Sequence, residues 1–315
     1  MDAVEKIKIA LDETRMLVLG AQVLLGFQLR GVFQAEFDAL SGPAKAGNGI
    51  ALLILVGVVG LLMAPAIQHR IVDDGEATRR IMRVISAAMT AALPLFALSL
   101  AINVFIALER IVDLAWAMGG GLIALAFALW FWFGAEWLSV FRSGRKDLLM
   151  VDAPTPLIKK IDQLLTEARV ILPGAQALLG FQLAVVLTSA FDLLPASSKA
   201  LHALALGLVA LCTILLMAPA AYHRIVYAGE AAPELQRLGS KFILLATMTL
   251  ALGLAADVYV VIARIAGEGF GFAAAMLALV ALVGVWHLSP LVLRWQRNAA
   301  ARAESQLGTV ARTPR

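Results

Sequence analysis

One ten-residue stretch occurs twice in this chain of 315 residues. Residues 20–29 read GAQVLLGFQL, and residues 174–183 read GAQALLGFQL, 154 positions later. A second stretch keeps the same offset, since residues 61–72 read LLMAPAIQHRIV and residues 215–226 read LLMAPAAYHRIV. The two halves align without a gap. The repeat therefore predicts a tandem duplication of one unit of about 150 residues, a common size for a domain.

The composition indicates which solvent the duplicated unit faces. Hydrophobic residues make up 61% of the chain and charged residues only 15%, whereas soluble domains carry about 25% charged residues. The excess apolar side chains are expected to face lipid, which predicts an all-α integral membrane protein. The single cysteine, Cys212, excludes an intramolecular disulfide, and no Cys/His metal spacing occurs.

Eight apolar runs are each long enough to cross a hydrocarbon core of about 30 Å as a helix. They lie at residues 16–38, 48–68, 84–108, 115–141, 170–192, 201–222, 242–263 and 271–293. The sequence thus predicts two parallel repeats of a four-transmembrane-helix unit. The predicted parts are a first membrane unit (1–141), a cytoplasmic linker (142–160), a second membrane unit (161–293) and a cytoplasmic tail (294–315).

Lysine and arginine predict the orientation of these spans. With the N-terminus in the cytoplasm, 21 of the 26 basic residues lie in cytoplasmic segments. The other five are Arg30, Lys45, Arg110, Lys199 and Arg264. Both termini are therefore predicted to be cytoplasmic, in a multi-pass protein of the cell inner (plasma) membrane. An even number of spans per unit makes the repeats parallel, unlike the inverted repeats of many transporters.

Polar residues inside the spans are the first candidates for function, because they are costly in lipid. The candidates for a transport or polar site are Gln22, Gln28, Arg30, Gln176, Gln182 and Asp257. The glutamines could form interhelical hydrogen bonds or line a polar pathway. Arg30 and Asp257 are charged in one repeat only, since their counterparts are Ala184 and Asn103. We expect an ion pair between them; a proton- or cation-binding Asp257 is the alternative.

A second set of candidates lies at the predicted cytoplasmic ends of the spans. It comprises Glu13, Arg15, His69, Arg70, Glu167, Arg169, His223 and Arg224. Each His-Arg pair follows a proline by four residues, and its expected partners are the charged residues of its own repeat. The pairs are interpreted as interfacial anchors of the helix ends, with pH sensing by histidine as the alternative. His287 is likewise expected at the interface.

No catalytic constellation, phosphate-binding loop or metal motif is recognisable, so neither an enzyme nor a cofactor is expected. The leading functional hypothesis is an ion or proton-coupled transporter or channel with a polar pathway near the repeat interface. The alternative is a structural or accessory membrane protein. The expected partners are the lipid bilayer, a monovalent cation or a proton, and further copies of the chain; no nucleic acid is expected.

Each half resembles an uncharacterised bacterial membrane family catalogued as domain of unknown function 6328. The resemblance rests on a Glu-x-Arg entry (Glu13/Arg15 and Glu167/Arg169), then Gln-x-Leu-Leu-x-Phe, then Phe-Asp, then Ala-Pro-Ala-x-x-His-Arg. It covers both halves of the chain. Typical members look like one four-span unit, so the resemblance implies a fused pair. It also implies a multi-pass membrane protein and no established activity.

Overall fold

The computed structural model describes residues 3–140 and 155–310, and every element in these ranges is helical. The first half contains α1 (Ala3–Gly31), η1 (Ala35–Ala39), α2 (Gly42–Ile71), α3 (Arg79–Glu109) and α4 (Leu114–Val140). The second half contains α5 (Leu157–Val186), α6 (Ser189–Asp192), α7 (Ala196–Ile225), α8 (Pro233–Ala266), α9 (Glu268–Val283), η2 (Gly284–Leu288) and α10 (Ser289–Val310). The order of elements in the first half thus recurs in the second.

The repeated sequence also builds the same helix ends in both halves. After α2 the chain turns at Gly75, whose φ is +76° and whose N–H donates to the carbonyl of His69. After α7 it turns at Gly229, whose φ is +86° and whose N–H donates to the carbonyl of His223. Glycine adopts a positive φ without the steric cost of a Cβ atom, so it ends a helix efficiently.

The two halves meet along α1 and α5, where equivalent residues contact each other. Lys8 Nζ lies 2.7 Å from Asp162 Oδ2, and the rings of Phe27 and Phe181 lie 4.8 Å apart. The two members of each pair are 154 positions apart. Contact between equivalent residues indicates a local two-fold axis between α1 and α5.

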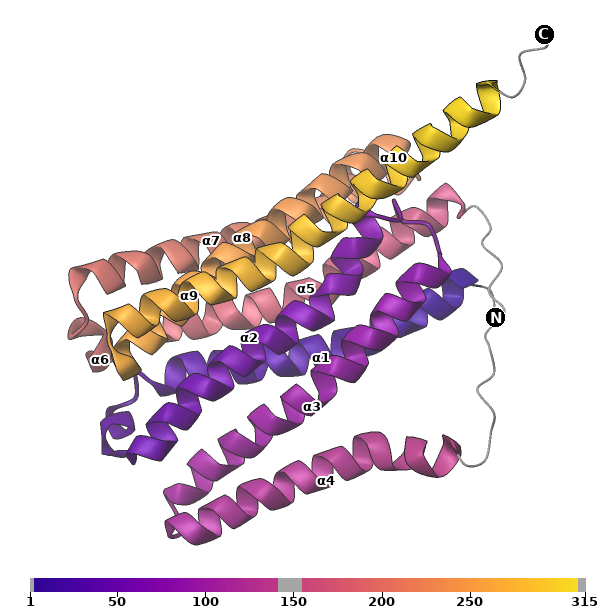
Figure 1. Ribbon diagram of the computed structural model, residues 1–315. Helices are drawn as coiled ribbons and strands as arrows, with labels where there is room; N and C mark the ends of the chain where they lie inside the picture. The colour runs from indigo at the N-terminus through magenta and orange to yellow at the C-terminus, as the bar shows by residue number, and fades with distance from the viewer. Residues whose placement is uncertain (1–2, 141–154, 311–315) are drawn as a thin grey trace.

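Seven helices within the described ranges are long and apolar enough to cross a membrane: α2, α3, α4, α5, α7, α8 and the continuous α9–α10. The first predicted run, in α1, does not reach that standard, because charged residues fill the first half of the helix. The eight-span layout therefore remains a prediction. Figure 1 shows the start of α1 and the ends of α2, α7 and α10 at one end of the bundle.

Two helices extend beyond the predicted apolar runs. The polar segment before residue 16 is continuous with the first apolar run in one helix, α1. The predicted tail continues as helix α10 to Val310 and projects beyond the bundle (Figure 1). Of the predicted linker, residues 142–154 lie outside the described residues, and α5 begins at Leu157.

Outside the α1–α5 contact the two halves are not packed alike. In the second half, Trp286 is fully buried and its Nε1 donates to the carbonyl of Gly60 on α2, 2.7 Å away. The equivalent Trp132 instead stacks on Phe96 within the first half, and α4 lies at the edge of the bundle against α3 (Figure 1). Position 214 on α7, the counterpart of Gly60, is isoleucine, and its side chain is 64% exposed.

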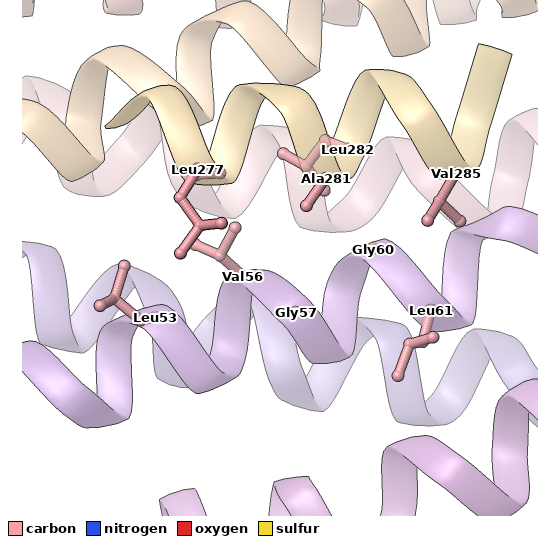
Figure 2. A pocket seen from close by; sticks show the side chains of 10 residues that line it. Leu53, Val56, Gly57, Gly60, Leu61, Leu277, Ala281, Leu282 and Val285 are labelled. Carbon is pink, nitrogen blue, oxygen red and sulfur yellow. The ribbon is translucent and has the colours of Figure 1, made fainter. Parts of the chain in front are cut away.

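Beside this contact, α2 and α9 border an apolar groove of about 370 Å³ (Figure 2). Its lining includes Leu53, Val56, Gly57, Leu277, Ala281 and Val285. A surface without polar groups at the middle of two long apolar helices is suited to contact with lipid tails.

Candidate functional site

The first buried polar cluster joins the end of α2 to the start of α5. Glu167 on α5 is fully buried, and its Oε1 lies 2.6 Å from His69 Nδ1. Its Oε2 accepts from Arg70 Nε. His69 Nε2 lies 3.1 Å from the carbonyl oxygen of Glu76. Both ring nitrogens of His69 thus have a partner. One carboxylate therefore contacts an imidazole and a guanidinium across the boundary between the halves.

The loop after α2 completes this cluster. Lys160 Nζ lies 2.5 Å from Glu76 Oε1, and the Thr155 N–H donates to Glu76 Oε2. Partial burial acts to raise the pKa of the Glu76 carboxyl, and the hydrogen bonds from Lys160 and Thr155 act to lower it. Together the hydrogen bonds outweigh the effect of burial, so the pKa lies below its ordinary value. We call Lys160, Glu167, His69, Arg70 and Glu76 the closed junction.

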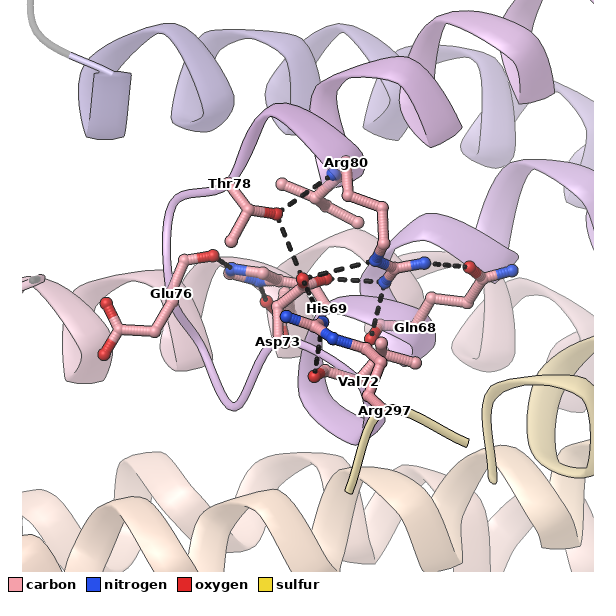
Figure 3. Close-up of polar contacts among 10 residues, drawn as sticks. Gln68, His69, Val72, Asp73, Glu76, Thr78, Arg80 and Arg297 are labelled. Carbon is pink, nitrogen blue, oxygen red and sulfur yellow. Dashed lines mark hydrogen bonds and ion pairs between the residues drawn. The ribbon is translucent and has the colours of Figure 1, made fainter. Parts of the chain in front are cut away.

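Beside the closed junction, a buried carboxylate ties three helices together (Figure 3). Asp73 accepts hydrogen bonds from Thr78, from Arg80 on α3 and from Arg297 on α10. Arg80 also donates to Gln68 Oε1 on α2. Asp73 is thus the point at which the C-terminal helix is fastened to the end of α2.

The structure corrects the interpretation of the His-Arg pairs as independent anchors within each repeat. His69 and Arg70 are buried rather than interfacial, and their partner Glu167 belongs to the other repeat. Arg169 is exposed and lies outside the cluster. In the second repeat, His223 is half-buried and Arg224 is exposed. Neither forms an ion pair with any residue in the described ranges.

The remaining cytoplasmic-end candidates lie on α1. Glu13 is exposed and Arg15 is half-buried. Glu13 is the counterpart of Glu167, 154 positions earlier, yet it contacts no histidine or arginine in the part of the chain that the structure describes. The glutamate of this family motif is therefore buried in one repeat and exposed in the other.

The second buried polar cluster lies near the opposite ends of α5, α7 and α8. Asp257 is 2% exposed, and its Oδ2 accepts from Gln182 Nε2 at 2.7 Å. Its Oδ1 lies 3.8 Å from His202 Nδ1. His202 Nε2 lies 3.1 Å from the carbonyl of Gln182, an acceptor, so this nitrogen carries a hydrogen. We call Asp257, Gln182 and His202 the carboxylate cluster.

A small cavity adjoins the carboxylate cluster. Its volume is about 10 Å³, close to the space that one water molecule requires. Leu29 at the end of α1 and Phe33 in the turn after it line the cavity as well. Gln182 Oε1 is buried and has no partner among the described residues. The cavity therefore places an unused acceptor, a carboxylate and an imidazole nitrogen within reach of one small occupant.

The first repeat carries a neutral version of this cluster. The residues equivalent to Gln182, His202 and Asp257 are Gln28, Asn48 and Asn103. Gln28 Nε2 donates to Asn103 Oδ1, as Gln182 donates to Asp257. Two amides in the first repeat are thus replaced by two titratable groups in the second. Sequence analysis did not single out His202, although its offset from Asn48 was a usable signal.

The predicted ion pair between Arg30 and Asp257 is wrong. Arg30 is exposed, and the described partners of Asp257 are Gln182 and His202. A buried histidine, which the sequence analysis had not considered, takes the position next to the carboxylate.

Two glutamines and one histidine also lie differently from expectation. Gln22 is fully buried against Gly174 and Met63, and its Oε1 has no described partner. Its equivalent Gln176 is exposed. His287 is buried in η2, with its Nε2 3.4 Å from Thr247 Oγ1, instead of lying at the interface.

The chain matches one known protein family. A family model described as "Family of unknown function (DUF6328)" matches residues 6–135 and again residues 157–290. The chain belongs to this family. The two matches agree with a tandem duplication of the family unit. No curated protein and no solved structure matches the chain.

The family motifs supply three of the five residues of the closed junction. Glu167, His69 and Arg70 come from the Glu-x-Arg and Ala-Pro-Ala-x-x-His-Arg motifs of different repeats, and they meet in the closed junction. Of the carboxylate cluster, only Gln182 lies in a motif quoted for the family. Asp257 and His202 distinguish the second repeat of this DUF6328 chain from its first.

Proposed function

We propose that this DUF6328 protein is an ion or proton-coupled membrane transporter whose ion-binding group is the carboxylate cluster. The observation that carries the proposal is the geometry of Asp257 and His202. Because His202 Nε2 donates to a carbonyl, the Nδ1 atom of the neutral ring presents a lone pair toward Asp257 Oδ1, 3.8 Å away. A lone pair facing a carboxylate is unfavourable, so one additional proton stabilises the pair.

A proton at this position can reside on either group. On His202 Nδ1 it creates an imidazolium beside a carboxylate, and on Asp257 it creates a carboxylic acid that donates toward the ring. A single water in the adjoining cavity would bridge the 3.8 Å separation. Buried titratable groups in membrane helices are costly and mark proton or ion sites in many transporters.

The wider proposal includes the predicted eight-span arrangement in the cell inner membrane, with both termini in the cytoplasm. In that arrangement the carboxylate cluster lies in the outer half of the membrane and the closed junction lies at the cytoplasmic end. Both clusters use the same face of α5, since Glu167, Gly174 and Gln182 recur at helical spacing and are all buried. The fifteen residues between Glu167 and Gln182 correspond to about 22 Å of helix.

The second candidate function is a structural or accessory role without transport. The size of the cavity favours it, because about 10 Å³ holds no more than one water and Gln28 does not line it. The two candidates differ in whether ions cross a membrane that contains only this protein.

The test is a flux assay in proteoliposomes with proton, Na⁺ and K⁺ gradients. The first repeat supplies matched substitutions: Asp257→Asn and His202→Asn recreate the amides that the same fold accommodates at positions 103 and 48. We expect either substitution to reduce flux by at least tenfold, whereas Asp192→Asn, at an exposed carboxylate, leaves it unchanged. Absence of flux from the wild-type protein, or full flux from the double variant, would refute the proposal. Flux measured with His69→Ala and with His223→Ala shows whether either His-Arg pair influences transport.

A further inference from the structure

The chain contains a second complete set of closed-junction residues. The counterparts of Lys160, Glu167, His69, Arg70 and Glu76 under the 154-residue offset are Lys6, Glu13, His223, Arg224 and Glu230. All five residue types are identical. We call this second set the open junction, because its members are exposed or half-buried and form no ion pair with one another in the described ranges.

The helix faces around the two glutamates differ in the same way. On α5, Gln163, Glu167 and Val170 are at most 1% exposed. Their counterparts on α1 are Ile9, Glu13 and Met16. Ile9 is 43% exposed and Met16 is 70% exposed, and Glu13 is exposed between them. A face that is covered on α5 is thus uncovered on α1.

The local structure needed to cover that face is already formed elsewhere. The turn after α7 has the same glycine-ended geometry as the turn after α2, with Gly229 donating to the carbonyl of His223. The guanidinium of Arg224 lies beside its turn glycine as that of Arg70 does. The end of α7 therefore repeats the backbone turn and the arginine placement of the closed junction.

We propose that the exposed face of α1 binds the His223-Arg224 end of α7 from a second copy of this chain. The interface is centred on Glu13 of one copy, which accepts hydrogen bonds from His223 and Arg224 of the other. Lys6 and Glu230 add an ion pair at its edge, in the manner of Lys160 and Glu76. The partner copy thereby completes a site that each copy holds only as two separated halves.

A second copy is favoured over the chain's own α7 by the packing of the second half. Within one chain α7 lies against α5 and α8, and in the described ranges neither His223 nor Arg224 forms an ion pair with Glu13. Charge complementarity supports the choice, because the α1 side offers a carboxylate and the α7 side offers a guanidinium. Two copies inserted in the same orientation also hold these groups at the same membrane level, as the closed junction does for their counterparts.

The duplicated sequence limits how far this interface extends. Gly60 on α2 admits Trp286, but its counterpart on α7 is Ile214, which is 64% exposed. The tight helix contact that accompanies the closed junction is therefore not available to α7. The contact between copies is expected to be concentrated at the cytoplasmic end, around Glu13.

Cysteine cross-linking in intact membranes tests the proposal. Two differently tagged full-length chains are co-expressed with Cys212→Ala, one carrying Glu13→Cys and the other Arg224→Cys. We expect oxidation to produce a disulfide-linked product that contains both tags. The pair Arg30→Cys and Arg224→Cys is the negative control, because these positions lie at opposite ends of the bundle. Lys8→Cys with Asp162→Cys in one chain is the positive control, since these residues contact within the chain.

The strength of the contact is measured by fluorescence energy transfer between labelled copies in liposomes. Glu13→Arg alone is expected to weaken association by about tenfold, and adding Arg224→Glu is expected to restore it. Cross-linking confined to a single chain carrying both cysteines would show that α7 closes on its own α1 and would overturn the proposal. Equal association of wild type and Glu13→Arg would overturn it as well.

Discussion

Glu167 shows how much one buried carboxylate contributes to joining the halves of this protein. It is fully buried and faces both His69 and Arg70. The Nη1 and Nη2 atoms of Arg70 are buried without a partner among the described residues, so Glu167 is the described acceptor for this guanidinium. Removing one member of a buried ion pair leaves an uncompensated charge, which costs more than the pair itself contributes.

The variant Glu167→Gln is therefore expected to lower the free energy of unfolding by about 3–5 kcal/mol. The matched control is Glu13→Gln, which alters the equivalent exposed glutamate and is expected to change it by less than about 0.5 kcal/mol. Both are measured by denaturant titration in detergent at a dilution that keeps the protein monomeric. Equal effects of the two substitutions would show that the closed junction does not stabilise the fold.

At the scale of elements, the contact between α2 and the α9–η2 segment depends on a single glycine. A Cβ atom at Gly60 would lie 2.9 Å from Leu282 Cδ2, and the Gly60 carbonyl accepts from Trp286. One turn earlier, Gly57 has no atom within 4 Å of the equivalent Cβ position. Two glycines on one helix thus differ sharply in what surrounds them.

We expect Gly60→Ile, which copies the residue at position 214, to destabilise the fold by about 1–3 kcal/mol through overpacking. Gly57→Ala should be neutral or stabilising by up to about 1 kcal/mol, because alanine is the better helix former. Thermal unfolding of the two variants in detergent compares them directly. A smaller loss of stability for Gly60→Ile than for Gly57→Ala would contradict the assigned role of Gly60.

At the scale of the whole molecule, the order of helices repeats in the two halves, but several contacts between the halves occur only once. The α1–α5 contact joins equivalent residues, but the closed junction and the Trp286 contact each occur once in the described structure. A third cross-repeat contact is also one-sided: Arg264 donates to the Val32 carbonyl and to Asp38, while its counterpart Arg110 is exposed. A fused chain can become asymmetric in this way because its halves mutate independently.

Membrane topology is the whole-molecule prediction that requires a separate test. Single cysteines at exposed positions, in a Cys212→Ala background, are treated with a membrane-impermeant thiol reagent on intact cells. Ala39→Cys and Ser197→Cys should react from outside, whereas Glu5→Cys and Ala231→Cys should react only after permeabilisation. If Glu5→Cys and Ala39→Cys react from the same side, α1 does not span and the eight-span arrangement is wrong.

The sequence by itself determined the duplication, the helical class and the family. These follow from the composition, from the offset of 154 residues and from short motifs, none of which depends on how the helices pack. Interhelical hydrogen bonds of Gln28 and Gln182 could be predicted from the sequence. Their partners Asn103 and Asp257 lie on other helices and could not be assigned.

Only the tertiary structure decided which of two identical motifs is used. His69 and His223 lie in the same Ala-Pro-Ala-x-x-His-Arg motif, and their helices end in the same turn, yet only His69 meets a buried glutamate. It likewise placed Asp257 beside His202 instead of Arg30. The physical reason is that burial depends on contacts between helices distant in sequence, which the residues of a short repeated motif do not specify.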